Sequence, residues 1–330
     1  MAPRFLHVAN GTSVTDTLAA AGVAGAQSIW SDPLFEGPVP AGASDDELIA
    51  IRVRYLSSPD DPGPVDPVND LRRWRAVIAA HEAYDELVLW FEHDLFDQLN
   101  LIQLLDWIRP RVPAEKTVSL ICIDSFPGRA SFKGLGELAP GELASLLPSR
   151  RGVTAAGSDL ASRAWAAFRE PTPEGLDDLR RDDTRALPYL SAALERFLQE
   201  YPWTRDGLSR SERRLLQIAA SGPTPLRSAF PRMHDGERAY YITDLSLASL
   251  AATLSTASPP LVTLDGAAPH SLAGAIAITD AGRAVLAGRA DRMSFGVDRW
   301  LGGVRVQSRA DLWRWDDDRS RIVRTRAASR

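Results

Sequence analysis

The apolar run at residues 87–91 is followed directly by Glu92, His93 and Asp94. Five consecutive apolar residues without polar alternation predict a strand that is covered on both faces, as in a parallel sheet. Apolar residues then recur at helical spacing, at Leu95, Leu99, Ile102, Leu105 and Ile108. The sequence therefore predicts a buried strand, a turn and a helix, with three ionisable side chains at the turn.

Further strand-like runs occur at residues 5–9, 27–30 and 117–123, and helical patterns occur at about 12–21, 68–83 and 95–108. Alternation of strands and helices is typical of an α/β fold with a parallel sheet. We therefore predict a Rossmann-like α/β domain over residues 1–139. A chain of 330 residues, of which 45% are hydrophobic, is long enough for about two domains.

The remainder of the chain has a different pattern. Residues 140–202 are predicted to form a helical bridge. In residues 203–330, Ser209 and Glu212 match a capping box, a second helical pattern covers 241–254, and two apolar runs at 260–264 and 275–278 predict a hairpin before a short helix. These elements predict a winged-helix-like α+β domain. The tail segments 299–306 and 312–316 are expected to form a C-terminal β-hairpin.

The charges are unevenly distributed along the chain. Residues 1–200 carry 19 basic and 30 acidic side chains, whereas residues 201–330 carry 19 and 13. The acidic first part disfavours a broad grip on a phosphate backbone unless metal ions intervene, whereas the basic second part permits one. The single cysteine, Cys122, excludes a disulfide framework within one chain. No segment predicts a membrane span or a secretory signal, so the cytoplasm is the expected location.

Polar residues follow each predicted strand, and the carboxyl ends of parallel strands share one edge of the sheet. We therefore expect a ligand site there that includes Asn10, Ser13, Asp32, Glu36 and Gln98. Asn10 and Ser13 begin a predicted helix, whose free N–H groups favour an anion such as phosphate. The alternative is that Ser13 only caps this helix.

The acidic residues of this edge predict metal-assisted chemistry. Glu92, Asp94 and Asp124 offer the oxygen ligands that Mg²⁺ or Mn²⁺ prefers. Glu92 and His93 are the candidate catalytic pair, because a carboxylate beside an imidazole that titrates near neutrality can transfer protons. The alternative for Asp94 and Asp97 is structural, with Asp94 capping the helix and Asp97 interacting with the helix dipole.

Several conspicuous residues are predicted to be structural. His7 lies within the first strand, and Trp313 and Trp315 share one face of a tail strand, where covering the core is favoured over stacking on bases. The helical pattern of the winged-helix-like part contains no Arg, Lys, Asn or Gln between residues 240 and 254. These are the side chains that read base edges, so sequence-specific DNA binding is not expected.

Four motifs, in order along the chain, resemble a bacterial family whose members share an N-terminal domain of unknown function. They are the segments at residues 7–13 (HVANGTS), 30–40 (WSDPLFEGPVP), 89–99 (LWFEHDLFDQL) and 298–303 (DRWLGG). The resemblance spans nearly the whole chain. It implies no reaction, cofactor or catalytic residue, so the function has to be argued from the site.

Two functions are compatible with the sequence. The first is a metal-assisted hydrolase or transferase that acts on a phosphorylated small molecule or nucleotide. The second is a non-enzymatic regulator or scaffold that senses a metabolite and uses its winged-helix-like domain to contact nucleic acid or another protein. The oligomeric state cannot be inferred from the sequence.

Overall fold

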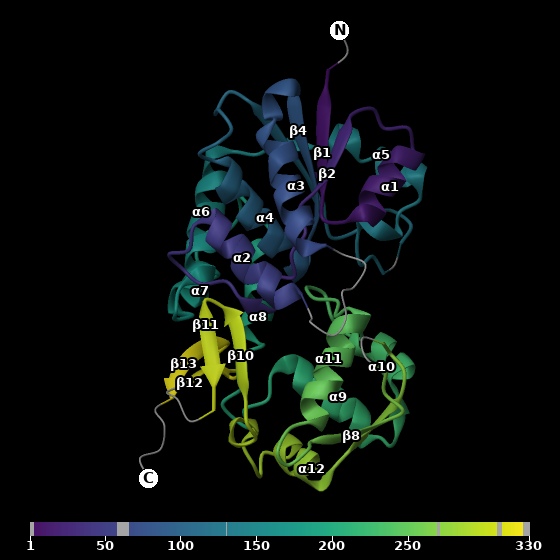
Figure 1. The fold of residues 1–330 in the computed structure, drawn as a ribbon, viewed down its shortest axis with the longest axis vertical. Helices are drawn as coiled ribbons and strands as arrows, with labels where there is room; N and C mark the ends of the chain where they lie inside the picture. The colour runs from purple at the N-terminus through teal and green to yellow at the C-terminus, as the bar shows by residue number, and fades with distance from the viewer. Residues whose placement is uncertain (1–2, 58–65, 130, 269–270, 309–311, 326–330) are drawn as a thin grey trace.

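The computed structural model describes residues 3–57, 66–129, 131–268, 271–308 and 312–325. Within these residues the protein has a mixed α/β fold with twelve α-helices (Figure 1). A mostly parallel five-stranded sheet lies in the N-terminal half. Three smaller sheets contain antiparallel pairs from the C-terminal half, and one of them also includes a short strand from the N-terminal half.

The five-stranded sheet has the strand order β2-β1-β4-β5-β6. Neighbouring strands are parallel except for β6, which is antiparallel to β5. Their bounds are β1, Phe5–Ala9; β2, Ala26–Ile29; β4, Glu86–Glu92; β5, Thr117–Ile123; and β6, Arg151–Gly152. The parallel sheet confirms the prediction of an α/β arrangement, and β1 and β5 begin and end at the predicted residues.

Helices cover both faces of this sheet, which explains why β4 is apolar along its length. Leu87, Leu89 and Phe91 of β4 pack in the larger hydrophobic cluster together with α4 (Leu95–Ile108). Val88 and Trp90 point to the opposite face and pack with Val14 and Leu18 of α1. The other helices of this region are α1, Thr12–Ala20; α2, Asp45–Leu56; α3, Pro67–Ala79; and α5, Pro140–Ala144, with a 3-10 turn at His81–Ala83.

His7 has the structural role that the sequence predicts. The side chain is fully buried in β1, and its two ring nitrogens contact the Trp90 Nε1–H (3.1 Å) and the carbonyl oxygen of Ala24 (3.2 Å). Burial lowers the pKa of His7. The imidazole therefore joins β1 to β4 as a hydrogen-bonded core residue.

The helical segment that follows packs directly on the first sheet region. It contains α6 (Ala155–Arg169), α7 (Glu174–Leu179) and α8 (Leu190–Leu198). Both α6 and α8 pack against α4, so α4 is enclosed by the sheet on one side and by helices on the other. Nearly all side chains of α4 are therefore buried, including the polar Asp97, Gln98, Asn100 and Gln103.

The C-terminal half begins with the predicted capping box, in which Ser209 and Glu212 each accept a hydrogen bond from the other's backbone N–H. The elements are α9, Arg210–Ala220; β7, Thr224–Pro225; α10, Leu226–Met233; α11, Asp244–Ser255; β8, Val262–Asp265; β9, Ala275–Ile278; and α12, Asp280–Leu286. Strands β8 and β9 form the predicted hairpin, and β7 adds to its edge. Helix α10 was not predicted.

The tail forms two hairpins, so the prediction of a single hairpin between residues 299–306 and 312–316 was wrong. Strand β10 (Asp298–Gly302) pairs with β11 (Val304–Gln307), and β12 (Leu312–Asp316) pairs with β13 (Arg321–Thr325). Each strand pairs with its nearest neighbour in sequence because short turns close antiparallel pairs easily. Trp315 is fully buried, as predicted.

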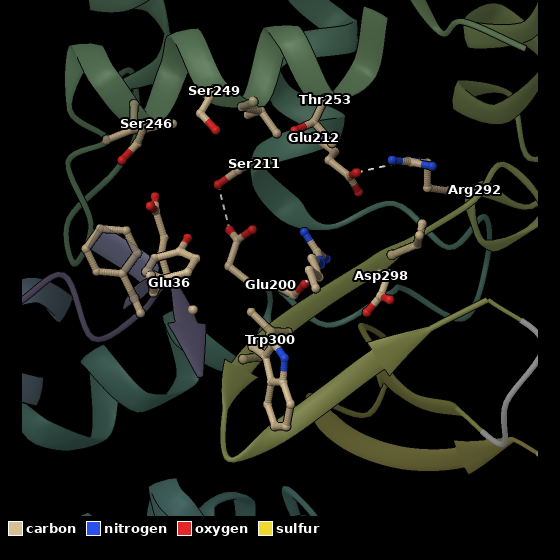
Figure 2. Close-up of a pocket in the computed structure, with 18 of the residues that line it drawn as sticks. Glu36, Glu200, Ser211, Glu212, Ser246, Ser249, Thr253, Arg292, Asp298 and Trp300 are labelled. Atoms are coloured by element: carbon tan, nitrogen blue, oxygen red, sulfur yellow. Dashed lines mark hydrogen bonds and ion pairs between the residues drawn. The ribbon is translucent and has the colours of Figure 1, made fainter. Parts of the chain in front are cut away.

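One small sheet contains strands from both halves of the chain. Residues 37–38 form β3 (Gly37–Pro38), which pairs in parallel with Leu301 and Gly302 of β10. A cavity of about 380 Å³ lies beside this junction, between α11 and β10 (Figure 2). The N-terminal and C-terminal halves are therefore joined by backbone hydrogen bonds as well as by side-chain packing.

Candidate functional site

The candidate site lies at the carboxyl ends of β1 and β4. Strand β1 has β2 on one side and β4 on the other, so the chain crosses from one side of β1 to the other between β2 and β4. In open parallel sheets, ligands bind at the point where the strand order reverses in this way. Strand β4 ends at Glu92, and α4 begins at Leu95 after the N-cap residue Asp94.

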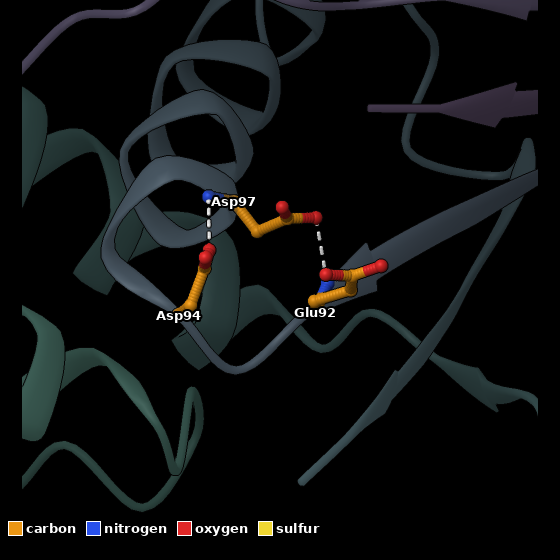
Figure 3. Close-up of side chains that lie close together, drawn as sticks. All are labelled: Glu92, Asp94 and Asp97. Atoms are coloured by element: carbon orange, nitrogen blue, oxygen red, sulfur yellow. Dashed lines mark hydrogen bonds between the residues drawn. The ribbon is translucent and has the colours of Figure 1, made fainter. Parts of the chain in front are cut away.

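Three carboxylates gather at this point (Figure 3). One ligand atom of each of Glu92, Asp94 and Asp97 lies within 4.8 Å of the others. The helical turn brings them together, because the backbone N–H of Asp97 donates to Asp94 Oδ1 (3.0 Å) and that of Glu92 donates to Asp97 Oδ1 (2.7 Å). We call Glu92, Asp94 and Asp97 the acidic group.

The acidic group is buried. The exposed fractions of Glu92, Asp94 and Asp97 are 9%, 7% and 1%. Burial and then the charge of Asp94 raise the pKa of Glu92 to about 8, although hydrogen bonds from the backbone N–H groups of Leu135 and Gly136 oppose this effect. Burial also raises the pKa of Asp94 to about 6 and the pKa of Asp97 well above its usual range.

The donor set fits a divalent cation. Buried carboxylates need a positive partner, yet none of the ion pairs among the residues that the structure describes involves Glu92, Asp94 or Asp97. The backbone N–H groups of Leu135 and Asp97 donate to Glu92 and Asp94, but they do not compensate the negative charges, and hard cations such as Mg²⁺ and Mn²⁺ prefer oxygen ligands. The cation would favour the ionised carboxylates that burial disfavours.

A loop after β5 closes over the acidic group. The backbone N–H of Leu135 donates to Glu92 Oε1 at 2.5 Å. Gly134 lies so close to Glu92 that a Cβ atom at this position would overlap the Glu92 carboxylate. The loop therefore requires glycine at position 134 in order to place the Leu135 N–H against the site.

His93 lies beside the acidic group, and its ring is surrounded by three aromatic side chains. Its ring centroid is 6.4 Å from Phe132, 6.1 Å from Tyr189 and 6.2 Å from Tyr241. The three aromatic residues come from three separate segments of the chain. The buried Nδ1 atom of His93 has no hydrogen-bond partner among the described residues. A buried polar atom without a partner suggests a bound group that supplies one.

Part of the C-terminal half completes this site. The carbonyl oxygen of Ala239 accepts a hydrogen bond from the backbone N–H of Leu95, the first residue of α4 (2.7 Å). Two residues later, Tyr241 contacts His93 and also His234, with ring centroids 5.7 Å apart in the second pair. The segment before α11 therefore covers the beginning of α4.

Two further predicted residues hold the acidic group in position. Asn10 Nδ2 donates to Asp97 Oδ2 at 2.6 Å, and Gln98 Nε2 donates to the backbone oxygen of Glu92 at 2.7 Å. Asn10 thus links the end of β1 to α4. The structure gives both side chains protein partners, so each is a positioning residue.

Ser13 and Asp124 lie near the site but outside the acidic group. Ser13 is exposed in the first turn of α1, against Gly136. The N-cap of α1 is Gly11, so Ser13 does not cap this helix. Asp124 is exposed after β5, and the pKa of Tyr189 is raised by burial and by the charge of Asp124. Asp124 therefore lies near Tyr189. The prediction that Asp124 joins Glu92 and Asp94 was wrong, because Asp97 is the third carboxylate of the group.

Asp32 and Glu36 do not join the acidic group. Arg52 holds Asp32 in a buried ion pair, with Nη2 2.6 Å and Nε 3.0 Å from Asp32 Oδ1. Asp32 is therefore occupied by a protein cation. Glu36 lines the cavity between α11 and β10 (Figure 2). The expectation of one shared pocket failed for these two residues because the loop after β2 turns away toward α2.

The sequence reading missed the role of Tyr189, Tyr241 and Leu135 and did not place Asp97 among the metal ligands. Asp97 had a visible signal, because a residue three positions after an N-cap lies in the same helical turn. The two tyrosines had none, since they are about 100 and 150 residues away from His93 along the chain.

No family model matches this chain, and the search of curated proteins found no match. Among the described residues, no helix has the length and apolar character required to cross a membrane. The site thus combines three buried carboxylates, a buried imidazole with a free nitrogen and the start of a helix. Such a set can bind a cation and move a proton next to it.

Proposed function

We propose that this protein is a metal-assisted hydrolase or transferase that acts on a phosphorylated small molecule or nucleotide. The observation that carries the proposal is the acidic group, which is buried at the carboxyl edge of a parallel sheet and, among the residues that the structure describes, forms no ion pair with a cationic side chain. A divalent cation there would stabilise negative charge that develops on a phosphoryl group during reaction.

The roles follow from the contacts. Glu92, Asp94 and Asp97 would hold Mg²⁺ or Mn²⁺. The Asn10 side chain orients Asp97, and the Gln98 side chain holds the end of β4 in place. Asp124 is left out of the ligand set, because it is exposed and faces Tyr189. Fixed supporting hydrogen bonds of this kind orient metal ligands.

His93 is the proposed general acid or base. Its Nδ1 atom is buried without a hydrogen-bond partner among the described residues, and the rings of Phe132, Tyr189 and Tyr241 surround the imidazole. Nδ1 could therefore accept a proton from an attacking hydroxyl or water, or donate one to a leaving oxygen. A positioned side chain in this role contributes about 10²–10⁴-fold to rate.

The start of α1 is the proposed anion site. Its N-cap, Gly11, makes no side-chain capping bond, so the first-turn N–H groups are not satisfied by a capping side chain. The Ser13 hydroxyl is exposed beside them. The Asn10 side chain is hydrogen-bonded to Asp97, so we no longer assign it to the anion. The proposed anion ligands are the first backbone N–H groups of α1 and the Ser13 hydroxyl.

A turnover assay tests the proposal. Phosphorylated small molecules and nucleotides should release or transfer phosphate only with Mg²⁺ or Mn²⁺, and His93→Gln should lower the rate by about 10²–10⁴-fold, as followed by phosphorus NMR. Glu82→Gln, which removes an exposed acid at the other end of β4, should leave the rate unchanged. Turnover that persists in EDTA would contradict the metal role, and a panel without any turnover would contradict the enzymatic function.

We further assign residues 1–139 to a Rossmann-like domain, 140–202 to a helical bridge and 203–330 to a winged-helix-like domain with the two tail hairpins. The first assignment is supported by four parallel strands that alternate with helices. The last is supported by the succession α9, β7, α10, α11, β8, β9, with β9 central in a three-stranded antiparallel sheet.

The regulator hypothesis makes a different prediction. Helix α11 would be the recognition helix, but it offers no Arg, Lys, Asn or Gln, and Ser246, Ser249 and Thr253 of this helix line the cavity toward β10. We therefore expect no enriched motif when the full chain is selected against random DNA duplexes at physiological salt. A motif preferred by about a thousandfold over random duplex would instead favour the regulator.

A further inference from the structure

The cavity between α11 and β10 is a second candidate site, distinct from the acidic group (Figure 2). Its volume of about 380 Å³ is within the range of small-molecule pockets. The loop after β2 contributes Phe35 and Glu36, and α2 contributes Tyr55. The cavity therefore lies where the N-terminal and C-terminal halves meet, which is a common position for ligand sites.

Two walls of the cavity differ in chemistry. Ser246, Ser249 and Thr253 lie three and four residues apart on α11, so their hydroxyls share one helix face, which Figure 2 shows directed into the cavity. Trp300 of β10 lies on the opposite side in the same view. A ligand there would contact hydroxyl groups on one side and an indole ring on the other.

Most charged groups of the lining already have partners. Arg292 Nε lies 2.9 Å from Glu212 Oε1. Glu200 Oε1 is bound by Arg196 Nη1 (2.6 Å) and by the Ser211 hydroxyl (2.6 Å). These pairs compensate two of the acids within the protein itself.

Glu36 is different, because no ion pair among the described residues includes its carboxylate. The nearby guanidinium of Arg52 is directed to Asp32 and to the backbone oxygen of Glu36, the latter at 2.6 Å. Burial raises the pKa of Glu36, and Ser246 partly offsets this effect. A carboxylate in this position lacks the cation that would stabilise its charged form.

Aromatic rings surround Glu36. Phe35 and Tyr240 pack edge to face with centroids 5.1 Å apart, and Tyr55 lies against Gly37, where a Cβ atom would collide with its ring. Gly37 also has a left-handed φ of +74°, which favours glycine. A carboxylate framed by aromatic rings is complementary to an ammonium group, which can form an ion pair and cation–π contacts together.

We propose that this cavity binds a small organic cation whose ammonium group pairs with Glu36. The hydroxyls of Ser246 and Ser249 would accept its remaining N–H groups. Of the four acids that line the cavity, Glu200, Glu212 and Asp298 pair with arginines among the described residues, so Glu36 is the acid whose charge remains for a ligand. A phosphate or carboxylate placed beside it would be repelled. This ligand class goes beyond the phosphorylated substrate proposed for the acidic group.

Three probes with the same four-carbon chain test the proposal: diaminobutane, butanediol and succinate. Calorimetry on the full chain in EDTA should detect binding of the diamine only. Glu36→Gln should weaken this binding by at least about tenfold, the effect of losing one charge-assisted hydrogen bond. Glu82→Gln is the matched control, since Glu82 is exposed and does not line the cavity, and it should retain the affinity within about twofold.

Equal binding of butanediol, binding of succinate, no binding of the diamine, or an unchanged affinity in Glu36→Gln would each overturn the proposal. The comparison of the three probes uses the unaltered protein, so it stays decisive even if the Glu36 variant fails to fold. EDTA also empties the acidic group, so the same titration is made with Glu92→Gln, which leaves the cavity unaltered and should bind the diamine with the affinity of the unaltered protein.

Discussion

Replacing Glu92 by Gln should abolish the binding of Mn²⁺ and Mg²⁺ while the protein remains folded. Gln is nearly isosteric with Glu, and its side-chain oxygen can still accept the hydrogen bond from the Leu135 N–H. The substitution removes one of three clustered charges without opening a cavity. We expect the affinity to fall by at least about 100-fold, more than for a residue that only supports a ligand.

Titration calorimetry and Mn²⁺ electron paramagnetic resonance would measure this loss. Glu82→Gln removes one charge from an exposed position at the other end of β4 and should bind the metal as the unaltered protein does. Unchanged binding by Glu92→Gln would return Glu92 to a structural role. A loss of folding would have the same consequence.

The same substitution should change how stability depends on pH. The pKa of Glu92 is raised by burial to about 8 in the folded protein, from 4.5 in the unfolded chain. The folded state therefore binds more protons, and this contribution is fully present below about pH 4.5 and is lost as the pH rises through about 8. Without metal, we expect the melting temperature to fall over this interval.

Glu92→Gln should remove much of that fall and make the metal-free protein more stable at pH 8, by on the order of a few kcal/mol. Added Mn²⁺ should stabilise the unaltered protein increasingly with pH, because the cation binds the ionised carboxylates. Thermal melts between pH 5 and 9 in EDTA test this. Parallel curves for the two proteins would show that Glu92 titrates alike in the folded and unfolded states.

Asp32→Asn should destabilise the protein by about 3–5 kcal/mol, the cost of leaving one charge of a buried ion pair without its partner. Arg52 is 1% exposed, and Asp32 is 3% exposed. Three guanidinium–carboxylate contacts of 2.6–3.0 Å join them, and Arg52 also binds two backbone oxygens of the loop after β2. The melting temperature should fall by roughly 10 °C.

Thermal and urea unfolding would measure this effect. Asp298→Asn breaks a half-exposed pair with Arg305 and should change stability by less than about 1 kcal/mol. Adding Arg52→Met to Asp32→Asn should restore part of the loss, because the uncompensated charge is then absent. A cost for Asp32→Asn as small as that of the control would contradict the structural role of this pair.

The elements that the sequence predicts best are those with purely local causes. The apolar run predicts β4, and the helical spacing of apolar residues predicts α4. Asp94 lies directly before this helical pattern, and it is the N-cap of α4. Helix α2 has an equally local capping box, Ser44 with Glu47, but its buried face includes Arg52. A charged residue in that face breaks the apolar pattern, and the helix was missed.

The site divides in the same way. Glu92, His93 and Asp94 follow one strand, so adjacency in sequence alone determines that they lie together at the carboxyl edge of the sheet. Only the tertiary structure decided that Arg52 neutralises Asp32, that Glu36 turns into another cavity and that Tyr189 and Tyr241 enclose His93. Such contacts join segments far apart in the chain, and their partners depend on how the helices and sheets pack, which no local pattern of residues encodes.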